Sequence, residues 1–211
     1  MGTIKQGILG GFNGKVGTVV GSSWKGITYM RGQAQHVKNP RTAGQVYSRT
    51  AFKAVSAALS PIASTLRLTF AKSAGKMSAF NKAVSINLKE AVENVEGILT
   101  VNYEKLILSK GNLPQFDYCI IDDISENGHY YISTINGFQI DYEGLIFFIY
   151  DVADKTWITG VIKQHFHTGQ TLEYTGIPLL GDKEYLCFAC AYNPATGQVS
   201  NPIKECEAIG G

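Results

Sequence analysis

In the first 35 residues, apolar and polar residues alternate as in β-strands, and glycines are frequent between the strand-forming residues. The dipeptides Asn13-Gly14 and Lys25-Gly26 are typical of two-residue hairpin turns, because both turn positions need a positive φ. We expect this glycine-rich arm, residues 1–35, to lie against another backbone, since glycines leave a strand with few side chains to pack. The pattern predicts strands at Ile4–Phe12, Lys15–Trp24 and Ile27–Ala34.

Between residues 40 and 97 the apolar residues recur at helical spacing. Thr42 is suited to cap a first helix. Ser60-Pro61 ends that helix and begins a second one, with Ser as its cap and Pro in its first turn. Ser78 caps a third helix, which Gly97 ends. The inward faces are predicted to hold Val46, Phe52, Val55 and Leu59 in the first helix; Ile62, Leu66 and Phe70 in the second; and Phe80, Val84, Leu88, Ala91, Val92 and Val95 in the third.

From Ile98 the apolar pattern changes to that of β-strands. The stretch 98–111 predicts a strand or a bent pair of strands, and seven short strands with turn sequences between them follow. This arrangement favours an immunoglobulin-like β-sandwich with Trp157 in its core. The seven strands are predicted at Phe116–Asp122, Tyr130–Ile135, Leu145–Tyr150, Trp157–His167, Gln170–Thr175, Tyr185–Tyr192 and Gln198–Glu205.

The predicted fold class is therefore α+β: a Gly-rich N-terminal β-hairpin arm, a small three-helix unit and a C-terminal immunoglobulin-like β-sandwich. We expect two domains, a basic arm-plus-helix domain at residues 1–113 and an acidic sandwich domain at 114–211. A chain of 211 residues is long enough for this organisation. No continuous apolar stretch predicts a transmembrane helix or a signal peptide, so we expect a protein made in the cytoplasm with no membrane contact.

Charge is distributed very unevenly along the chain. Residues 1–89 hold 13 Lys plus Arg and no Asp or Glu, whereas residues 90–211 hold 6 basic and all 17 acidic residues. The net charge of the whole chain is only +2, so two segments of opposite sign nearly cancel. Opposite charge on the two ends of one chain favours head-to-tail docking between copies, because complementary fields guide encounter and register.

The side chains that carry chemistry do not form a recognisable catalytic motif. Cys119, Cys187, Cys190 and Cys206 are interpreted as buried thiols. Cys187 and Cys190 would point to opposite faces of a strand, which argues against a redox or zinc pair. His165 and His167 would share one strand face, but no third metal ligand is evident from spacing. Asp122 and Asp123 are interpreted as solvated residues before a turn. We therefore predict no catalytic residue, no metal and no cofactor.

Several stretches of the sequence resemble a known group of proteins. These are "MGTIKQGILGGFNGKVGTVVGSSWKGITYMRG", "NPRTAGQVYSRTAFKAV", "LSPI", "MSAFNKAVSINLKEAV" and "LILSKGNL", which together span residues 1 to about 113. They resemble an uncharacterised family of about 210 residues from Bacteroidetes and their phages. Gly44 departs from the family pattern, where a better helix former is expected. A second likeness, to segments of phage virion proteins, is carried by Asn39, Pro40, Arg41, Thr42, Gln45, Arg49 and Phe52.

The resemblance implies a non-enzymatic virion structural protein in a capsid-associated, connector or tail position. It carries no catalytic residue over to this chain. The expected partners are further copies of the chain, as a homo-oligomer, and other virion proteins. The assembly contacts are predicted at Gly10, Gly11, Lys15, Trp24, Lys25, Tyr29, Arg31, Arg41 and Arg49.

Three alternatives stay open at this point. One is a cell-surface adhesion module, in which immunoglobulin-like sandwiches often serve, although the missing signal peptide argues against it. Residues 1–89 are basic and contain aromatic residues, which is also typical of nucleic-acid contact. Against this, no two basic residues in that segment are adjacent, and Lys outnumbers Arg nine to four. The third alternative is an arm that folds back onto its own helices, so that the charge asymmetry acts within one molecule.

Overall fold

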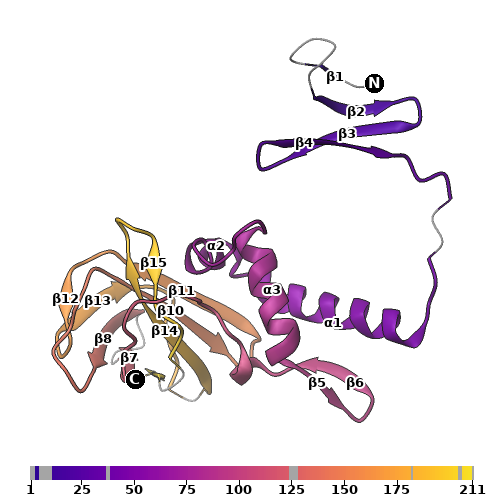
Figure 1. Ribbon diagram of the computed structural model, residues 1–211. Coiled ribbons are helices and arrows are strands. Elements are labelled where there is room, and N and C mark those ends of the chain that lie inside the picture. The colour runs from indigo at the N-terminus through magenta and orange to yellow at the C-terminus, as the bar shows by residue number, and fades with distance from the viewer. Residues whose placement is uncertain are drawn as a thin grey trace. The chain divides into compact units, whose positions relative to one another are not determined.

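The computed structural model describes residues 3–4, 11–36, 39–123, 128–181, 183–203 and 206–210, and it shows a mixed α+β protein (Figure 1). The chain forms two compact units, Met1–Thr42 and Ala43–Gly211. The three helices and the C-terminal sheets therefore belong to one unit. The predicted boundary at residue 113 separates the part of the chain that is expected to act in assembly from the rest, and it stays a prediction.

The N-terminal unit is a four-stranded antiparallel sheet. Lys25 and Gly26 form the turn between its last two strands with φ of 48° and 82°, so that predicted hairpin turn is confirmed. The other turn falls at Gly17-Thr18 and not at Asn13-Gly14, which was the wrong prediction. The strands, in the order β1-β2-β3-β4, are β1 Thr3–Ile4, β2 Phe12–Val16, β3 Val19–Trp24 and β4 Ile27–Gly32.

Gly14 serves as a bend inside β2 instead of a turn. Its φ is 105°, a conformation that glycine adopts without steric cost. From Gly14 onward β2 pairs with β3, and the preceding Asn13 pairs with Thr3 of β1. The dipeptide Asn13-Gly14 thus signals positive φ correctly, but the sequence does not show whether the chain reverses there.

Three helices open the C-terminal unit: α1 Ala43–Leu59, α2 Ala63–Thr69 and α3 Ala79–Glu90. The Ser78 side chain accepts a hydrogen bond from the Asn81 backbone N–H at 3.2 Å, so the predicted cap of α3 is confirmed. In α1 the predicted burial of Val55 and Leu59 is confirmed, but Val46 is about half exposed. Val46 precedes Val55 by nine residues, which is half a rotation of the helix, so the two cannot face the same core.

The third helix ends at Glu90 and does not run to Gly97. The strands β5 Val92–Val95 and β6 Ile98–Val101 form a hairpin there, followed by the short 3₁₀ helix η1 Tyr103–Lys105. Glu96 and Gly97 both have positive φ, 52° and 85°, in the turn of this hairpin. The apolar spacing in this stretch fits both periods, and the Glu-Gly turn with β-branched residues on each side decides for the strand.

The rest of the C-terminal unit contains two four-stranded sheets, ordered β11-β10-β14-β15 and β13-β8-β7-β16, and a small β12-β9 pair. The last strand, β16, is parallel to β7, and the other pairs are antiparallel. The bounds are β7 Tyr118–Asp123, β8 His129–Ile135, β9 Asp141–Tyr142, β10 Leu145–Asp151, β11 Thr156–Ile162, β12 Phe166–His167, β13 Thr171–Thr175, β14 Tyr185–Asn193, β15 Gln198–Val199 and β16 Cys206–Gly210.

Strand β10 lies between two hydrophobic cores. Phe147 and Ile149 point into a core shared by the two four-stranded sheets. Ile146 and Phe148 point to the other face, into a core shared with the helices. A strand buried on both faces reads as a continuous apolar run, which is what "LIFFIYD" shows. Trp157 packs in the helix-side core and donates a hydrogen bond from its Nε1–H to the Ala58 carbonyl at 3.1 Å, so its predicted place between the sheets is wrong.

The cysteines follow the same two faces. Cys187 lies in the core between the sheets and Cys190 in the helix-side core, which confirms their opposite orientation. Cys187 is joined to Cys206 in a disulfide that links β14 to β16, so the prediction of four free thiols is wrong for this pair. Cys119 and Cys190 are buried free thiols. The bond joins residues 19 apart on two different sheets, a proximity that spacing along the chain does not reveal.

Candidate assembly interface

The strand register of the N-terminal unit brings predicted contact residues to one face of the sheet. Directly opposite residues share a face, and Lys15 is opposite Val20, which is in turn opposite Arg31. Trp24 is opposite Ile27 on the same face. We call this surface the arm face; it consists of Lys15, Val20, Ser22, Trp24, Ile27, Tyr29 and Arg31.

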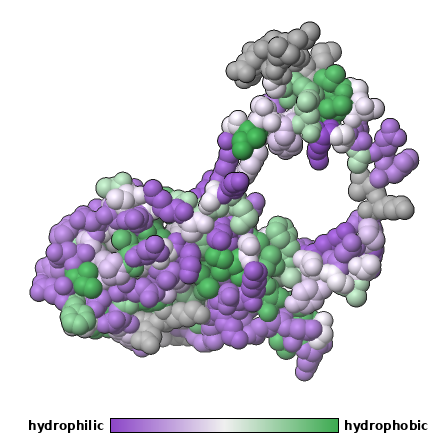
Figure 2. Space-filling model, viewed as in Figure 1, coloured by the Kyte–Doolittle hydropathy of each residue, from purple (hydrophilic) through white to green (hydrophobic). Residues whose placement is uncertain are grey.

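The arm face presents large apolar and aromatic side chains to solvent. Trp24 is 53% exposed, Ile27 68% and Tyr29 47%. In the space-filling view (Figure 2), hydrophobic residues of this unit are visible at the surface beside hydrophilic ones. The described residues of the unit include no helix and form one sheet, so these residues supply no second layer over this face. Covering the face would remove its apolar surface from water.

The chemistry of the arm face is aromatic and cationic. Lys15 and Arg31 are two strands apart on the same side of the sheet, and both are exposed. Lys25 is exposed in the turn at the Trp24 end. Because residues 1–89 contain no carboxylate side chain, the segment itself offers these cations no acidic partner.

Gly11, another predicted contact, belongs to the opposite face of the sheet. A Cβ at Gly11 would overlap the Thr28 side chain, and a Cβ at Gly21 would overlap the backbone and ring of Phe12. These glycines thus let the start of β2 pass close to its neighbours within the unit. A backbone lies close to Gly21, as predicted, but it belongs to Phe12 of the arm itself, and at Gly11 the close neighbour is a side chain. Gly10 lies outside the described residues.

The two remaining predicted contacts are not on the arm face. Arg41 is an exposed residue near the end of the N-terminal unit, and Arg49 is an exposed residue of α1 in the other unit. Ile27 and Met30 are the most exposed apolar residues of β4, and they were not predicted. The alternation of β4 would have found Ile27, which stands two residues before Tyr29 on the same face.

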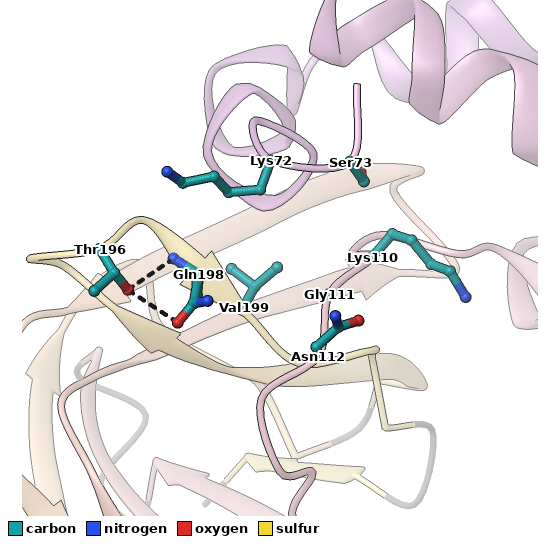
Figure 3. A pocket seen from close by; sticks show the side chains of 8 residues that line it. All are labelled: Lys72, Ser73, Lys110, Gly111, Asn112, Thr196, Gln198 and Val199. Carbon is teal, nitrogen blue, oxygen red and sulfur yellow. Dashed lines mark hydrogen bonds between the residues drawn. The ribbon is translucent and has the colours of Figure 1, made fainter. Parts of the chain in front are cut away.

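The C-terminal unit has a cavity of about 260 Å³ between the segment after α2, the loop after η1 and the β14–β15 hairpin (Figure 3). Lys72 and Lys110 are on its wall, but their side chains point away from each other. The Thr196 hydroxyl donates to Gln198 Oε1 at 3.3 Å, so these polar groups satisfy one another. The lining combines ammonium, hydroxyl and amide groups: Lys72, Ser73, Lys110, Gly111, Asn112, Thr196, Gln198 and Val199. The Ser73 hydroxyl donates to the Phe70 carbonyl at 3.2 Å, so its proton is directed at a backbone oxygen and not at a base.

The titratable residues considered in the sequence have structural partners. His165 is exposed, with Nδ1 at 3.4 Å from Glu143 Oε1. Asp123 is fully buried, which corrects its interpretation as a solvated residue; its Oδ2 accepts the N–H groups of Gly128 at 2.8 Å and Leu179 at 3.0 Å. Within the described ranges, no three His, Cys, Asp or Glu side chains are placed to hold a metal ion.

Two further ionic observations bear on stability and reactivity. Burial raises the pKa of the Cys119 and Cys190 thiols to about 12, so both stay protonated near neutral pH. Burial by itself acts to raise the pKa of Asp151. Hydrogen bonds from the Asp154 backbone and the Lys183 ammonium together have the larger effect, so the pKa of Asp151 is lowered. Lys183 Nζ is 2.9 Å from Asp151 Oδ2. This cluster joins the β10–β11 turn to the segment before β14.

Taken together, the fold defines an α+β protein whose N-terminal sheet exposes an aromatic and basic face, attached to a larger unit with two packed sheets. The chain belongs to the family described as "Family of unknown function (DUF6266)", whose model matches residues 11–126. That match runs from the arm through the three helices into β7. No curated protein and no solved structure matches the chain significantly. No helix in the described part of the chain is both long enough and apolar enough to cross a bilayer.

Proposed function

We propose that the protein is a non-enzymatic structural subunit that self-assembles through its N-terminal arm. The observation that carries the proposal is the arm face, on which Trp24, Ile27 and Tyr29 are about half exposed or more, and which no other described residues of the arm unit cover as a second layer. Exposed apolar patches of this kind mark interaction sites, and Trp, Tyr and Arg dominate interface energetics.

The charge distribution favours further copies of the chain as the partner. The arm lies in a segment with 13 basic and no acidic residues, and residues 90–211 carry all 17 acidic ones. Exposed carboxylates are spread over the C-terminal unit, for example at Asp141, Glu173 and Glu207. An arm docked on the acidic part of a neighbour leaves that neighbour's own arm available for the next copy. Such heterologous contacts generate rings or helical stacks.

The finer part of the proposal is a phage or prophage virion protein, in a capsid-associated, connector or tail position. It rests on the resemblance of the first 113 residues to phage-encoded proteins. Synthesis in the bacterial cytoplasm and final location in the virion follow from that role. We include an immunoglobulin-like topology for the C-terminal sheets in the proposal, supported by two four-stranded sheets over one shared core.

Electron microscopy and native mass spectrometry of the nucleic-acid-free full chain test this proposal. We expect rings, stacks or other defined oligomers from the wild type. The variant Trp24→Ala/Tyr29→Ala removes two aromatic residues of the arm face, and we expect it to be monomeric. Thr28→Ala, on the opposite face of the same strand, is the matched control and should assemble as the wild type does. A monomeric wild type, or assembly that survives the double substitution, would contradict the proposal.

A second candidate function is nucleic-acid binding by the same face. The observation that favours it is the placement of Lys15 and Arg31 beside Trp24 and Tyr29, since cations next to stacking aromatic residues bind single strands. Its test is a titration of the wild type and of Lys15→Ala/Arg31→Ala with a fluorescent oligonucleotide at several salt concentrations. A monomeric protein whose affinity for the oligonucleotide falls by tenfold or more in the variant would favour this function over self-assembly.

A further inference from the structure

Strand β4 leaves one edge of the N-terminal sheet open. Trp24 and Ile27 flank a two-residue turn, so they form a hydrogen-bonded pair, and the pairs of Tyr29 and Arg31 with β3 are bonded in the same way. The bond from the Gln33 N–H to the Thr18 carbonyl at 2.7 Å continues this pattern. The N–H and C=O groups of Thr28, Met30 and Gly32 therefore point away from the sheet. Among the described residues no strand pairs with that side.

The edge of β13 is open in the same manner. The Gly176 N–H donates to the Gly128 carbonyl at 2.7 Å, in register with the β13–β8 ladder. This bond sets the alternation, so Leu172 and Tyr174 bond to β8, and the backbone groups of Thr171, Glu173 and Thr175 point outward. Within the described part of the chain no strand lies beside this edge. An open edge of this kind is a template for strand addition.

The other described edges fit a basic strand less well. The edge strand β11 holds no carboxylate, and Lys155 directly precedes it and Lys163 directly follows it in the sequence. At the end of β16 the backbone of residues 179–181 lies so close that a Cβ at Gly210 would overlap it. The β5–β6 hairpin has Glu93, but its carboxylate is held by Lys105 at 2.6 Å. The remaining edge strands, β1, β9, β12 and β15, are only two residues long each.

Glu173 gives the β13 edge its negative charge. Its side chain is 67% exposed, and its Oε2 is 3.6 Å from His129 Nε2, a partner that is charged only when protonated. Arg31 is the matching cation on β4. Pairing of β4 with β4 of a second copy would offer Arg31 no carboxylate, because β4 holds none.

We propose that the open edge of β13 is the docking site for strand β4 of a second copy, and that the two strands run parallel. In an antiparallel pair the outward residues face each other, which would place Glu173 beside Thr28, Met30 or Gly32. In a parallel pair each outward residue lies between two outward residues of its partner, so Arg31 is placed beside Glu173. The chain already contains one parallel edge pair, β16 on β7.

The parallel register also matches the two faces of the sheets. With Arg31 beside Glu173, Met30 falls beside Leu172, on the side of β13 that faces the core. Met30 is 69% exposed in the free arm, so this contact removes its apolar surface from water. Tyr29 falls beside Thr171 on the outer side. The inference rests on the proposed function, and it names the surface that receives the arm.

A charge-swap series in the full chain, read by sedimentation velocity, tests the inference. We expect Arg31→Glu and Glu173→Arg each to raise the dissociation constant for self-association about tenfold or more. The double variant Arg31→Glu/Glu173→Arg should recover to within about threefold of the wild type. Rescue also shows that the single variants lost assembly through the contact and not through misfolding. Glu207→Arg, the same charge change at an exposed glutamate of β16 that the proposed pair does not involve, is the matched control and should assemble normally.

Strand direction is tested by disulfide cross-linking between two differently sized tagged chains. A chain with Tyr29→Cys should cross-link to a chain with Thr171→Cys, and an antiparallel pair would not bring these positions together. Met30→Pro, which removes an outward N–H but no bond to β3, should abolish association, whereas Met30→Ala should only weaken it. Wild-type assembly that ignores both charge swaps overturns this inference and leaves the proposed function standing. A wild type that never associates overturns both.

Discussion

The N-terminal sheet and the C-terminal sheets use similar residues in opposite ways. In β10, aromatic and branched residues such as Phe147 and Ile149 are buried in a core shared by two sheets. In β3 and β4, Trp24, Ile27 and Tyr29 follow the same strand alternation, yet they stay largely exposed. The difference lies in what covers them: another layer of the same unit in one case, and no layer among the described residues of the arm unit in the other. Strand propensity forms both sheets, but it does not determine whether a face is buried.

The comparison predicts its largest effect when one aromatic residue is truncated in each region. Phe147→Ala should lower the free energy of unfolding by about 3–5 kcal/mol, because a fully buried ring leaves a cavity. Tyr29→Ala should change the unfolding of the C-terminal unit by less than about 0.5 kcal/mol. Denaturant unfolding of both variants, followed by circular dichroism, makes the measurement. Equal losses in the two variants would mean that Tyr29 is part of a folded core.

The next effect concerns a buried polar link inside the C-terminal unit. Asn87 of α3 donates to the carbonyls of Ala83 and Ile107, at 3.0 and 2.8 Å, and accepts the Ile107 N–H at 2.7 Å. Asn87→Ala leaves two groups of Ile107 without these bonds, so we expect a loss of about 2–3 kcal/mol in unfolding free energy. Asn87→Asp, which keeps the acceptor oxygen, is the comparison variant. If Asn87→Ala had the same free energy of unfolding as the wild type, the hydrogen bonds of Asn87 would contribute nothing to stability.

Two glycines of the arm offer a smaller and sharper test. A Cβ at Gly21 would overlap Phe12, whereas Gly32 has nothing within 4 Å of that position. Gly21→Ala should therefore disturb the arm by about 1–3 kcal/mol and weaken assembly, and Gly32→Ala should not. Both should leave thermal unfolding of the C-terminal unit within about 1 °C of the wild type. Native mass spectrometry and calorimetry on the same samples give the two readouts.

The smallest effect is a pH dependence of the C-terminal unit. The pKa of Asp151 is lowered in the folded state, so its contribution to stability is present above the unfolded pKa of about 3.9 and is lost as pH falls through the folded value. In Asp151→Asn, the free energy of unfolding should therefore change less with pH on the acid side than in the wild type. Near neutral pH its dependence on pH should be unchanged. Urea unfolding at a series of pH values measures the profile. A profile identical to the wild type would exclude Asp151 as a source of acid sensitivity.

Sequence reasoning recovered the parts of the fold that local physics decides. The Lys25-Gly26 turn, the Ser78 cap and the buried run of β10 are each determined by neighbours along the chain. The misassigned features depend on distant partners. Asn13-Gly14 signals positive φ, but pairing with β1 and β3 decides that it bends a strand. Trp157 packs against the helices and donates a hydrogen bond to the Ala58 carbonyl, and Cys187 forms a disulfide with Cys206 of the other sheet.

For the candidate site, the sequence supplied the chemistry and the structure supplied its arrangement. Lys15, Trp24, Tyr29 and Arg31 were predicted as contacts from composition and resemblance alone. Only the register of β2, β3 and β4 shows that all four share one face, and that Gly11 belongs to the other. The receiving surface at β13 could not be predicted, because an open edge is a property of the assembled sheet and not of the strand.

The central claim is that the chain self-assembles through its N-terminal arm. Sedimentation equilibrium of nucleic-acid-free full-length protein measures this most directly, over a range of concentrations and at low and high salt. The account predicts a reversible oligomer for the wild type, weaker at high salt, and a monomer for Trp24→Ala/Tyr29→Ala. A wild type that sediments as a single monomeric species at every concentration would contradict it.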